Sequence, residues 1–257
     1  MLVIAPLRVA RDTWPQEALK WDHLKGLTLA VAVGSKQDRL HALAKSAMVT
    51  VINRENVPWL VAHYGAAWPF DMVVIDELSS FKNHRAKRFT TLVKIRPYVS
   101  RWVGLTGTPA SNGLMDLWAQ FRLLDGGSRL GRYITRFRDR WFVPDKRAGM
   151  QVFTYKPRAG AEDEIYEAIS DMTLSMRTTD HLTLPELTLT TTKVKLADQE
   201  RAVYERLEQD LVIELDGQVV DAANAAVLSG KLLQLASGAI YDENGDVIVV
   251  HGVKLDA

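Results

Sequence analysis

The sequence predicts an α/β protein built on a doubly wound parallel sheet, followed by a mostly helical segment and a short tail that contains β-strands. Short apolar runs rich in β-branched residues recur through the first half of the chain, and stretches with helical periodicity lie between them. Uninterrupted apolar runs are typical of strands that are covered on both faces of a parallel sheet. Strands that alternate with helices favour a doubly wound layer.

Five apolar runs are the predicted strands of this sheet. They are LVIA from Leu2, LTLAVAV from Leu27, MVTVIN from Met48, MVVID from Met72 and WVGLTG from Trp102. Residues 39–47 illustrate the helices predicted between them, because their apolar side chains recur at helical spacing. A buried helix can imitate one or two such runs, but hardly five in this rhythm.

The chain changes character after Asp125. The residues Asp125-Gly126-Gly127-Ser128 are typical of a loop. Further along, the alternating sequence LTLTTTKVKL from Leu187 predicts a strand, and Asp198 is predicted to cap the start of a helix. Near the end of the chain, Asn244-Gly245 lies between apolar runs, which predicts a β-hairpin.

The composition is that of an ordinary globular protein and indicates no particular partner. The 257 residues include 32 Lys and Arg against 31 Asp and Glu, and 47% of them are hydrophobic. No cysteine is present, which excludes disulfides and thiolate zinc sites. The six histidines show no His-Glu-x-x-His spacing, which favours surface or packing roles over a metal cluster.

The sequence predicts no contact with a membrane. No apolar run reaches the ~18 residues that a bilayer-spanning helix needs. The apolar start Met1–Ala5 lacks basic residues and ends at Pro6, so a strand explains it better than a signal peptide. The expected location is the cytoplasm of a bacterial cell, where a virus-encoded protein would also act.

Basic residues gather in two stretches. Residues 128–158 contain nine basic residues against two acidic ones, with aromatic residues interleaved among them. A second group of basic residues lies between Lys82 and Arg96. Cations that contact phosphates and rings that stack on bases favour nucleic-acid binding by at least one group, without readout of base sequence. The alternative is a helical subdomain with rings packed inward and arginines at the surface, which the spacing of Tyr133, Phe137 and Trp141 favours for the rings.

Two carboxylates follow the fourth predicted strand, in FDMVVIDELSSFKN from Phe70. Ligands of open α/β sheets bind beyond the carboxyl ends of the strands. At this edge Asp76 can hold Mg²⁺, which prefers oxygen ligands, and Glu77 can orient or deprotonate an attacking water. The alternative is a strand that runs into a solvated acidic turn, and the motif alone does not decide between the two.

The fifth predicted strand enters Thr106-Gly107-Thr108-Pro109. Glycine permits a close approach of the backbone, proline fixes the turn, and the two threonine hydroxyls face whatever binds at the edge. The alternative is a plain strand-to-helix turn in which Ser111 or Asn112 caps the following helix, and both can hold together.

These two segments, in this order, resemble the Swi/Snf-type ATPases of helicase superfamily II. DELSSFKN is similar to the family's Asp-Glu box, and LTGTPASNGLMDLWAQFRLLDGG is similar to its Thr-Gly-Thr-Pro segment and following helix. LVIAPLRVARDTWPQEALKW and VTVINRENVPWL resemble its DNA-facing strand ends, and KLLQLASGAIYDENG with HGVKLDA resembles the version found in bacteriophage members. The resemblance covers most of the chain.

The resemblance implies a RecA-like motor that uses ATP and Mg²⁺ and moves on double-stranded DNA. It implies that Asp76 and Glu77 are catalytic and bind the metal, and that nucleotide state is coupled to DNA grip by Ser79, Thr106, Gly107, Thr108 and Pro109. The DNA-binding positions that it implies are Pro6, Arg8, Asn53, Lys82, Asn83, Arg88 and Asn112. Many relatives have histidine where this chain has Ser79, which puts the usual link between the two motifs in question.

The same resemblance implies an incomplete motor. Residues 1–125 would form part of the first lobe, residues 126–185 a basic and aromatic helical insertion, and residues 186–257 the bridge and the start of the second lobe. The phosphate loop Gly-x-x-x-x-Gly-Lys-Ser/Thr occurs nowhere in the chain, so we expect it upstream of Met1. The second lobe would supply an arginine finger from beyond the chain. We therefore expect the chain alone to hydrolyse ATP negligibly.

Two other readings remain open from the sequence. The chain can be a non-catalytic DNA-binding or scaffold protein derived from such a motor. It can also be part of a restriction-type helicase subunit, which shares these motifs and needs a nuclease elsewhere. A complete motor would act together with the missing segments or with a partner chain.

Overall fold

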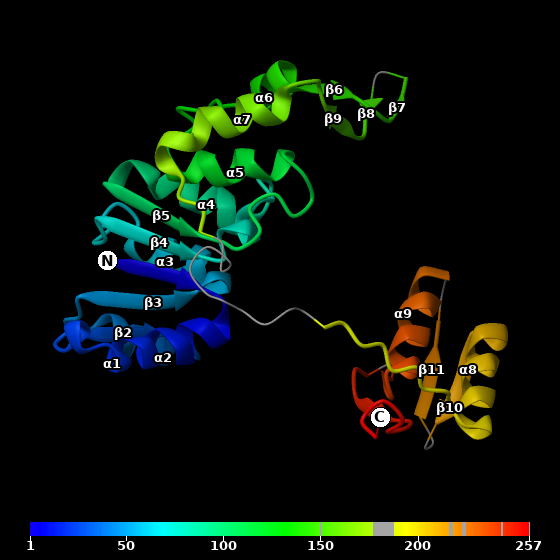
Figure 1. The fold of residues 1–257 in the computed structure, drawn as a ribbon. Coiled ribbons are helices and arrows are strands. Elements are labelled where there is room, and N and C mark those ends of the chain that lie inside the picture. The colour runs from blue at the N-terminus through cyan, green and yellow to red at the C-terminus, as the bar shows by residue number, and fades with distance from the viewer. Residues whose placement is uncertain (150, 177–187, 216–217, 223–224, 243, 257) are drawn as a thin grey trace. The chain divides into compact units, whose positions relative to one another are not determined.

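The computed structural model describes residues 1–149, 151–176, 188–215, 218–222, 225–242 and 244–256 (Figure 1). The chain divides into two compact units, Met1–Met176 and Arg177–Ala257. Each unit has a hydrophobic core of its own among the described residues.

The first unit contains a parallel five-stranded sheet, with the strands in the order β2-β3-β1-β4-β5. The strands are β1 (Leu2–Ala5), β2 (Leu29–Ala32), β3 (Val49–Asn53), β4 (Met72–Asp76) and β5 (Arg101–Leu105). These are the five runs that the sequence predicts, and the α/β class is confirmed.

Helices cover both faces of this sheet. Leu2 and Ile4 of β1 point into a large core with the helices α2 to α5, whereas Val3 points into a smaller core with a π-helical turn and α1. The elements around the sheet are the π-helix Val9–Thr13, α1 (Trp14–Lys20), α2 (Lys36–Leu43), α3 (Val57–Tyr64), α4 (Lys87–Ile95) and α5 (Met115–Leu124). This alternation explains why the strands lack a polar face.

The helix expected at residues 39–47 begins and ends earlier than its apolar pattern suggests. Helix α2 spans Lys36–Leu43, and Ser35 forms a capping box with Asp38 at its start. In this box the Ser35 hydroxyl accepts a hydrogen bond from the Asp38 N–H, and the Asp38 carboxylate accepts one from the Ser35 N–H. The cap therefore fixes where the helix begins.

The rest of the first unit is a pair of helices with a narrow β-ribbon between them (Figure 1). The elements are α6 (Ile134–Trp141), β6 (Phe142–Pro144), β7 (Arg147–Ala148), β8 (Gln151–Val152), β9 (Tyr155–Pro157) and α7 (Ala161–Ile169). Phe137 and Trp141 are buried in the same core as the sheet, as their spacing predicts, but Tyr133 is 60% exposed. Residues 126–176 thus share the core of the sheet.

The second unit is a small α+β body. Its elements are α8 (Asp198–Asp210), β10 (Val212–Leu215), β11 (Gln218–Asp221), α9 (Ala225–Ala236), β12 (Ala239–Tyr241) and β13 (Val247–Val249). The two strand pairs, β10-β11 and β12-β13, are antiparallel, and their core includes Leu207, Leu235 and Ile240. The hairpin predicted at Asn244-Gly245 is confirmed as β12-β13.

Two local predictions in this region are wrong. Residues 188–196 of the segment LTLTTTKVKL form no regular element, and Leu187 lies outside the described residues. An alternating pattern makes a strand only where a partner strand pairs with it, and no such partner is present among the described residues. Asp198 is the first residue of α8 and not its cap, because Ala197 occupies that position.

No helix in the described ranges combines the length and apolar character needed to cross a bilayer.

Candidate functional site

The two acidic residues lie where parallel strands end. Asp76 is the last residue of β4 and pairs in register with Leu105, the last residue of β5. Glu77 and Thr106 therefore follow neighbouring strands at the same edge of the sheet. This is the edge at which open α/β sheets bind their ligands.

Glu77 is held in place by two hydroxyl groups. The Ser79 Oγ donates a hydrogen bond to Glu77 Oε1, and the Thr106 Oγ1 donates to the same oxygen at 3.4 Å. The other oxygen, Oε2, accepts no hydrogen bond from the described residues. Ser79 thus joins the acidic box to the Thr106 turn through Glu77.

The backbone of Glu77 adopts a left-handed conformation, with φ 59° and ψ 59°. This region is unusual for a residue with a side chain and costs free energy that the surroundings must offset. Leu78, which follows, is buried against Gly104 of β5. A Cβ atom at position 104 would collide with the Leu78 side chain, so Gly104 allows this turn to pack on the sheet.

Asp76 has a partner that the sequence does not reveal. The indole Nε1 of Trp14 donates a hydrogen bond to Asp76 Oδ2 at 3.0 Å, across 62 residues of sequence. Trp14 is the first residue of α1 and packs against the smaller core. Oδ1 of Asp76 accepts no hydrogen bond from any described residue. The acidic pair therefore presents one open oxygen on each carboxylate.

The open oxygens fit a magnesium ion. Mg²⁺ prefers hard oxygen ligands and is usually held by one or two carboxylates, its remaining positions filled by water and phosphate oxygens. The described ranges contain no group of three or more His, Asp or Glu side chains that would enclose a metal ion. Asp76 and Glu77 are therefore the residues that could hold such an ion, together with ligands from water or phosphate.

The Thr106–Pro109 turn is connected to the helix that follows it. Gln120 Nε2 of α5 donates a hydrogen bond to the Pro109 carbonyl at 2.6 Å, and Asp116 accepts one from the Asn112 N–H at 3.0 Å. The expected cap by Ser111 or Asn112 is not formed, since α5 begins at Met115 without a side-chain cap. Asp116 instead organises the loop before the helix.

Lys82 is part of the same network. Its Nζ donates to Ser111 Oγ at 2.8 Å and lies 3.4 Å from Asp116 Oδ2. The lysine predicted to bind DNA is thus paired with a carboxylate, and a phosphate would have to compete for it. The acidic box and the loop after β5 are joined by this contact as well as through Glu77.

The remaining predicted DNA-binding residues differ in how accessible they are. Pro6 directly follows β1, and Arg8, Asn83 and Asn112 are exposed. Arg88 folds back, because its Nη2 donates to the Ser80 carbonyl at 2.7 Å.

Asn53, at the end of β3, is only 6% exposed. Its amide donates to Glu55 at 2.9 Å and accepts from Asn56. Burial raises the pKa of Glu55, but hydrogen bonds from Asn53 and Arg54 outweigh it and the pKa lies below its ordinary value. The buried Asn53 amide is therefore hydrogen-bonded to a carboxylate that is charged at neutral pH.

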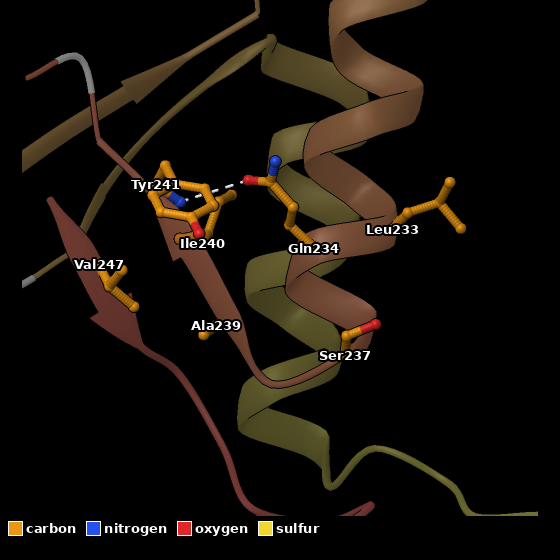
Figure 2. A pocket seen from close by; sticks show the side chains of 7 residues that line it. All are labelled: Leu233, Gln234, Ser237, Ala239, Ile240, Tyr241 and Val247. Atoms are coloured by element: carbon orange, nitrogen blue, oxygen red, sulfur yellow. Dashed lines mark hydrogen bonds between the residues drawn. The ribbon is translucent and has the colours of Figure 1, made fainter. Parts of the chain in front are cut away.

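An open pocket of about 400 Å³ lies in the second unit, and no acidic residue lines it. Figure 2 shows that its walls come from the end of α9, from β12 and from β13. Its lining residues are Leu233, Gln234, Ser237, Ala239, Ile240, Tyr241 and Val247, none of them charged at neutral pH. The pocket lacks the cations and carboxylates that nucleotide binding requires.

The parallel sheet, the acidic pair and the Thr-Gly-Thr-Pro turn define a class of protein, and comparison with known proteins identifies it. The sequence profile of the SNF2-related domain matches residues 1–240, so the chain belongs to the SNF2-related family. Protein p41 of Acyrthosiphon pisum secondary endosymbiont phage 1 is 42% identical over the whole chain, which covers 57% of p41. The mouse DNA excision repair protein ERCC-6-like is 30% identical over 51% of the chain, which covers 11% of that protein.

A solved structure shares the fold. The Sulfolobus solfataricus SWI2/SNF2 ATPase core in complex with dsDNA matches with a TM-score of 0.53 and 22% identity, over 92% of this chain and 46% of that one. The chain thus spans about half the length of p41 and of this ATPase core.

Proposed function

We propose that this chain forms part of an ATP-dependent motor that moves on double-stranded DNA. The observation that carries the proposal is the acidic pair, in which Glu77 is fixed by Ser79 and Thr106 and each carboxylate keeps an open oxygen. The family membership supports it, as do the names of the similar proteins, which include an ATPase core in complex with dsDNA and a DNA excision repair protein.

Each residue of the pair has its own role in this proposal. When bound, Mg²⁺–ATP supplies the phosphoryl group whose transfer to water releases free energy. Asp76 would hold the cation through its open oxygen Oδ1, while Trp14 donates its hydrogen bond to Oδ2. Glu77 accepts the proton of the attacking water at Oε2. Thr106 responds to a change at Glu77 through the hydrogen bond between the two side chains. This conformational change is transmitted through Gly107, Thr108 and Pro109 to α5 and to the neighbouring DNA-facing residues.

The phosphate loop has to come from elsewhere in the complete motor. Gly230-Lys231 is followed by Leu232, so the sequence has no Gly-x-x-x-x-Gly-Lys-Ser/Thr loop to neutralise the phosphates. We infer that this loop and an arginine finger are supplied by further motor segments or by a partner chain, in the cytoplasm of a bacterial cell. In this division residues 1–125 belong to the first lobe, 126–185 to an insertion, and 186–257 to the bridge and the start of the second lobe.

We expect that the affinity of the chain alone for duplex DNA falls steeply as the salt concentration rises. We also expect that the chain alone hydrolyses ATP negligibly. Contacts to phosphates release counterions, so log K should fall linearly with log[salt]. Fluorescence anisotropy with a labelled duplex and a coupled ATPase assay measure the two properties on one preparation. Equal affinity at low and moderate salt would show that the protein does not track the backbone, and a DNA-stimulated turnover near one per second would refute the inferred division of the motor.

Substitution of Trp14 by phenylalanine is expected to raise the Mg²⁺ concentration for half-maximal ATPase activity of the complete motor by about fivefold. The ring keeps its packing, but the hydrogen bond to Asp76, which we take as worth about 1 kcal/mol, is lost. Trp21→Phe is the matched control, because Trp21 donates an equivalent bond to Glu17, away from the site. Identical Mg²⁺ responses of the two variants would remove Trp14 from the site.

A further inference from the structure

The β-ribbon formed by β6 to β9 (residues 142–149 and 151–157) lies outside the acidic site, and its strands β7 and β8 contribute no described residue to the core. Figure 1 shows that it projects beyond α6 and α7, on the side toward which the strands of the sheet run. Its outer strands β7 and β8 pair only with each other, through Arg147 with Val152 and Ala148 with Gln151. Packing in the core therefore does not explain why the chain has this ribbon.

The base of the ribbon is firmly attached. Phe142 is buried, and Arg158 donates a backbone hydrogen bond to the Trp141 carbonyl at 3.0 Å. The Arg158 guanidinium donates to both oxygens of Glu164 at 2.7 and 2.8 Å, and this hydrogen bonding lowers the pKa of Glu164. Arg138 lies over the Tyr155 ring at 4.8 Å. The ribbon is therefore presented at a fixed angle to the helices.

The outer part of the ribbon carries free positive charge. Lys146, Arg147 and Lys156 are exposed, and none of them forms an ion pair with a described residue. The acidic residue among them, Asp145, accepts a hydrogen bond from the Thr154 hydroxyl at 2.9 Å. The three cations thus outnumber the single carboxylate, and no described residue forms an ion pair with any of them.

An aromatic ring lies among these charges. Phe153 is 60% exposed, and its N–H donates to the Lys146 carbonyl at 2.7 Å, so the ring stands across the ribbon from a cation. A single exposed apolar residue needs no explanation. DNA-binding proteins use such a combination, in which an exposed apolar side chain packs against a DNA groove and neighbouring cations bind the phosphates.

We propose that the ribbon is a second contact with duplex DNA, in which Lys146, Arg147 and Lys156 bind backbone phosphates and Phe153 packs against the groove. The inference rests on the proposed function. Its position fits, because the ribbon extends on the side toward which the strands run (Figure 1). Pro6, Asn83 and Asn112 follow the carboxyl ends of β1, β4 and β5 in the chain. The contact reads no base sequence; it lengthens the stretch of backbone that the protein holds.

The test compares two triple variants in the same salt-dependent duplex-binding experiment. Lys146→Ala, Arg147→Ala and Lys156→Ala together are expected to lower the slope of log K against log[salt] by about 2 to 3, since each phosphate contact contributes about 0.9. The control removes Lys25, Lys45 and Arg101, which are also exposed and lie at or just before the amino-terminal ends of β2, β3 and β5. The control should keep the slope of the wild type.

A single variant tests the ring. Phe153→Ala is expected to weaken duplex binding about tenfold with an unchanged salt slope, and Phe153→Leu to restore most of the loss, because an apolar wedge remains. Equal slopes for the two triple variants would overturn the ribbon contact, and the ribbon would then be free for a protein partner. Wild-type binding without any salt dependence would instead overturn the proposed function, so the two failures are distinguishable.

Discussion

Replacement of Glu77 by glutamine is expected to lower the DNA-stimulated ATP turnover of the complete motor by about 10²–10⁴-fold. The complete motor here means this chain together with the segments that carry the phosphate loop and the second lobe. The amide keeps the size of the side chain and an oxygen for the hydrogen bonds from Ser79 and Thr106. It cannot accept a proton from water, so the chemical step is lost while ATP and DNA still bind.

The informative measurement records turnover and nucleotide affinity on the same preparation. Thr106→Val is the matched control, because it removes one donor to Glu77 and leaves the base itself in place. We expect a loss of about fivefold for this variant, in line with a single hydrogen bond. If Glu77→Gln left turnover intact, Glu77 would not be the base. If the complete assembly with Glu77 present turned over no ATP, the chain would be a DNA-binding scaffold derived from a motor.

The sheet was predictable from the sequence because a parallel strand that is buried on both faces consists of a continuous run of apolar residues. All five runs become strands, and the turn residues after β4 and β5 meet because parallel strands end at one edge. The segment LTLTTTKVKL fails for the opposite reason. Its alternation indicates a half-buried strand, but pairing depends on a distant partner that no local pattern specifies.

The placement of the acidic pair and the Thr106 turn at one edge of the sheet was predictable, but their hydrogen bonds were not. The order of the motifs brings Asp76, Glu77 and Thr106 together, but nothing local indicates that Trp14 reaches Asp76 across 62 residues. Lys82 was expected to face DNA, and in the structure it also binds Ser111 and lies near Asp116. Charge and position are properties of the sequence, whereas a long-range side-chain contact depends on packing that only the folded chain shows.

Truncation of Trp141 to alanine is expected to destabilise the first unit by about 3–5 kcal/mol. Trp141 is 1% exposed, its ring lies 5.3 Å from the Phe137 ring, and its Nε1 donates to Glu164 at 3.1 Å. The core that it fills also holds the strands of the sheet, so the sheet and residues 126–176 should unfold together. Among the described residues, the core of the second unit is built from that unit's own side chains, and we expect its transition to stay at the wild-type temperature.

Differential scanning calorimetry of the wild type, Trp141→Ala and Trp141→Phe separates the possibilities. Phenylalanine keeps most of the buried ring and loses the bond to Glu164, so about 1 kcal/mol is expected for that variant. A third transition that alone responds to Trp141 would mean that residues 126–185 fold as a domain separate from the sheet. A shared core instead couples the ribbon to the lobe, since Trp141 and Phe142 anchor its base in the core that supports Asp76 and Glu77. A force on the ribbon would then act on the same packed core that holds the strand before the acidic pair.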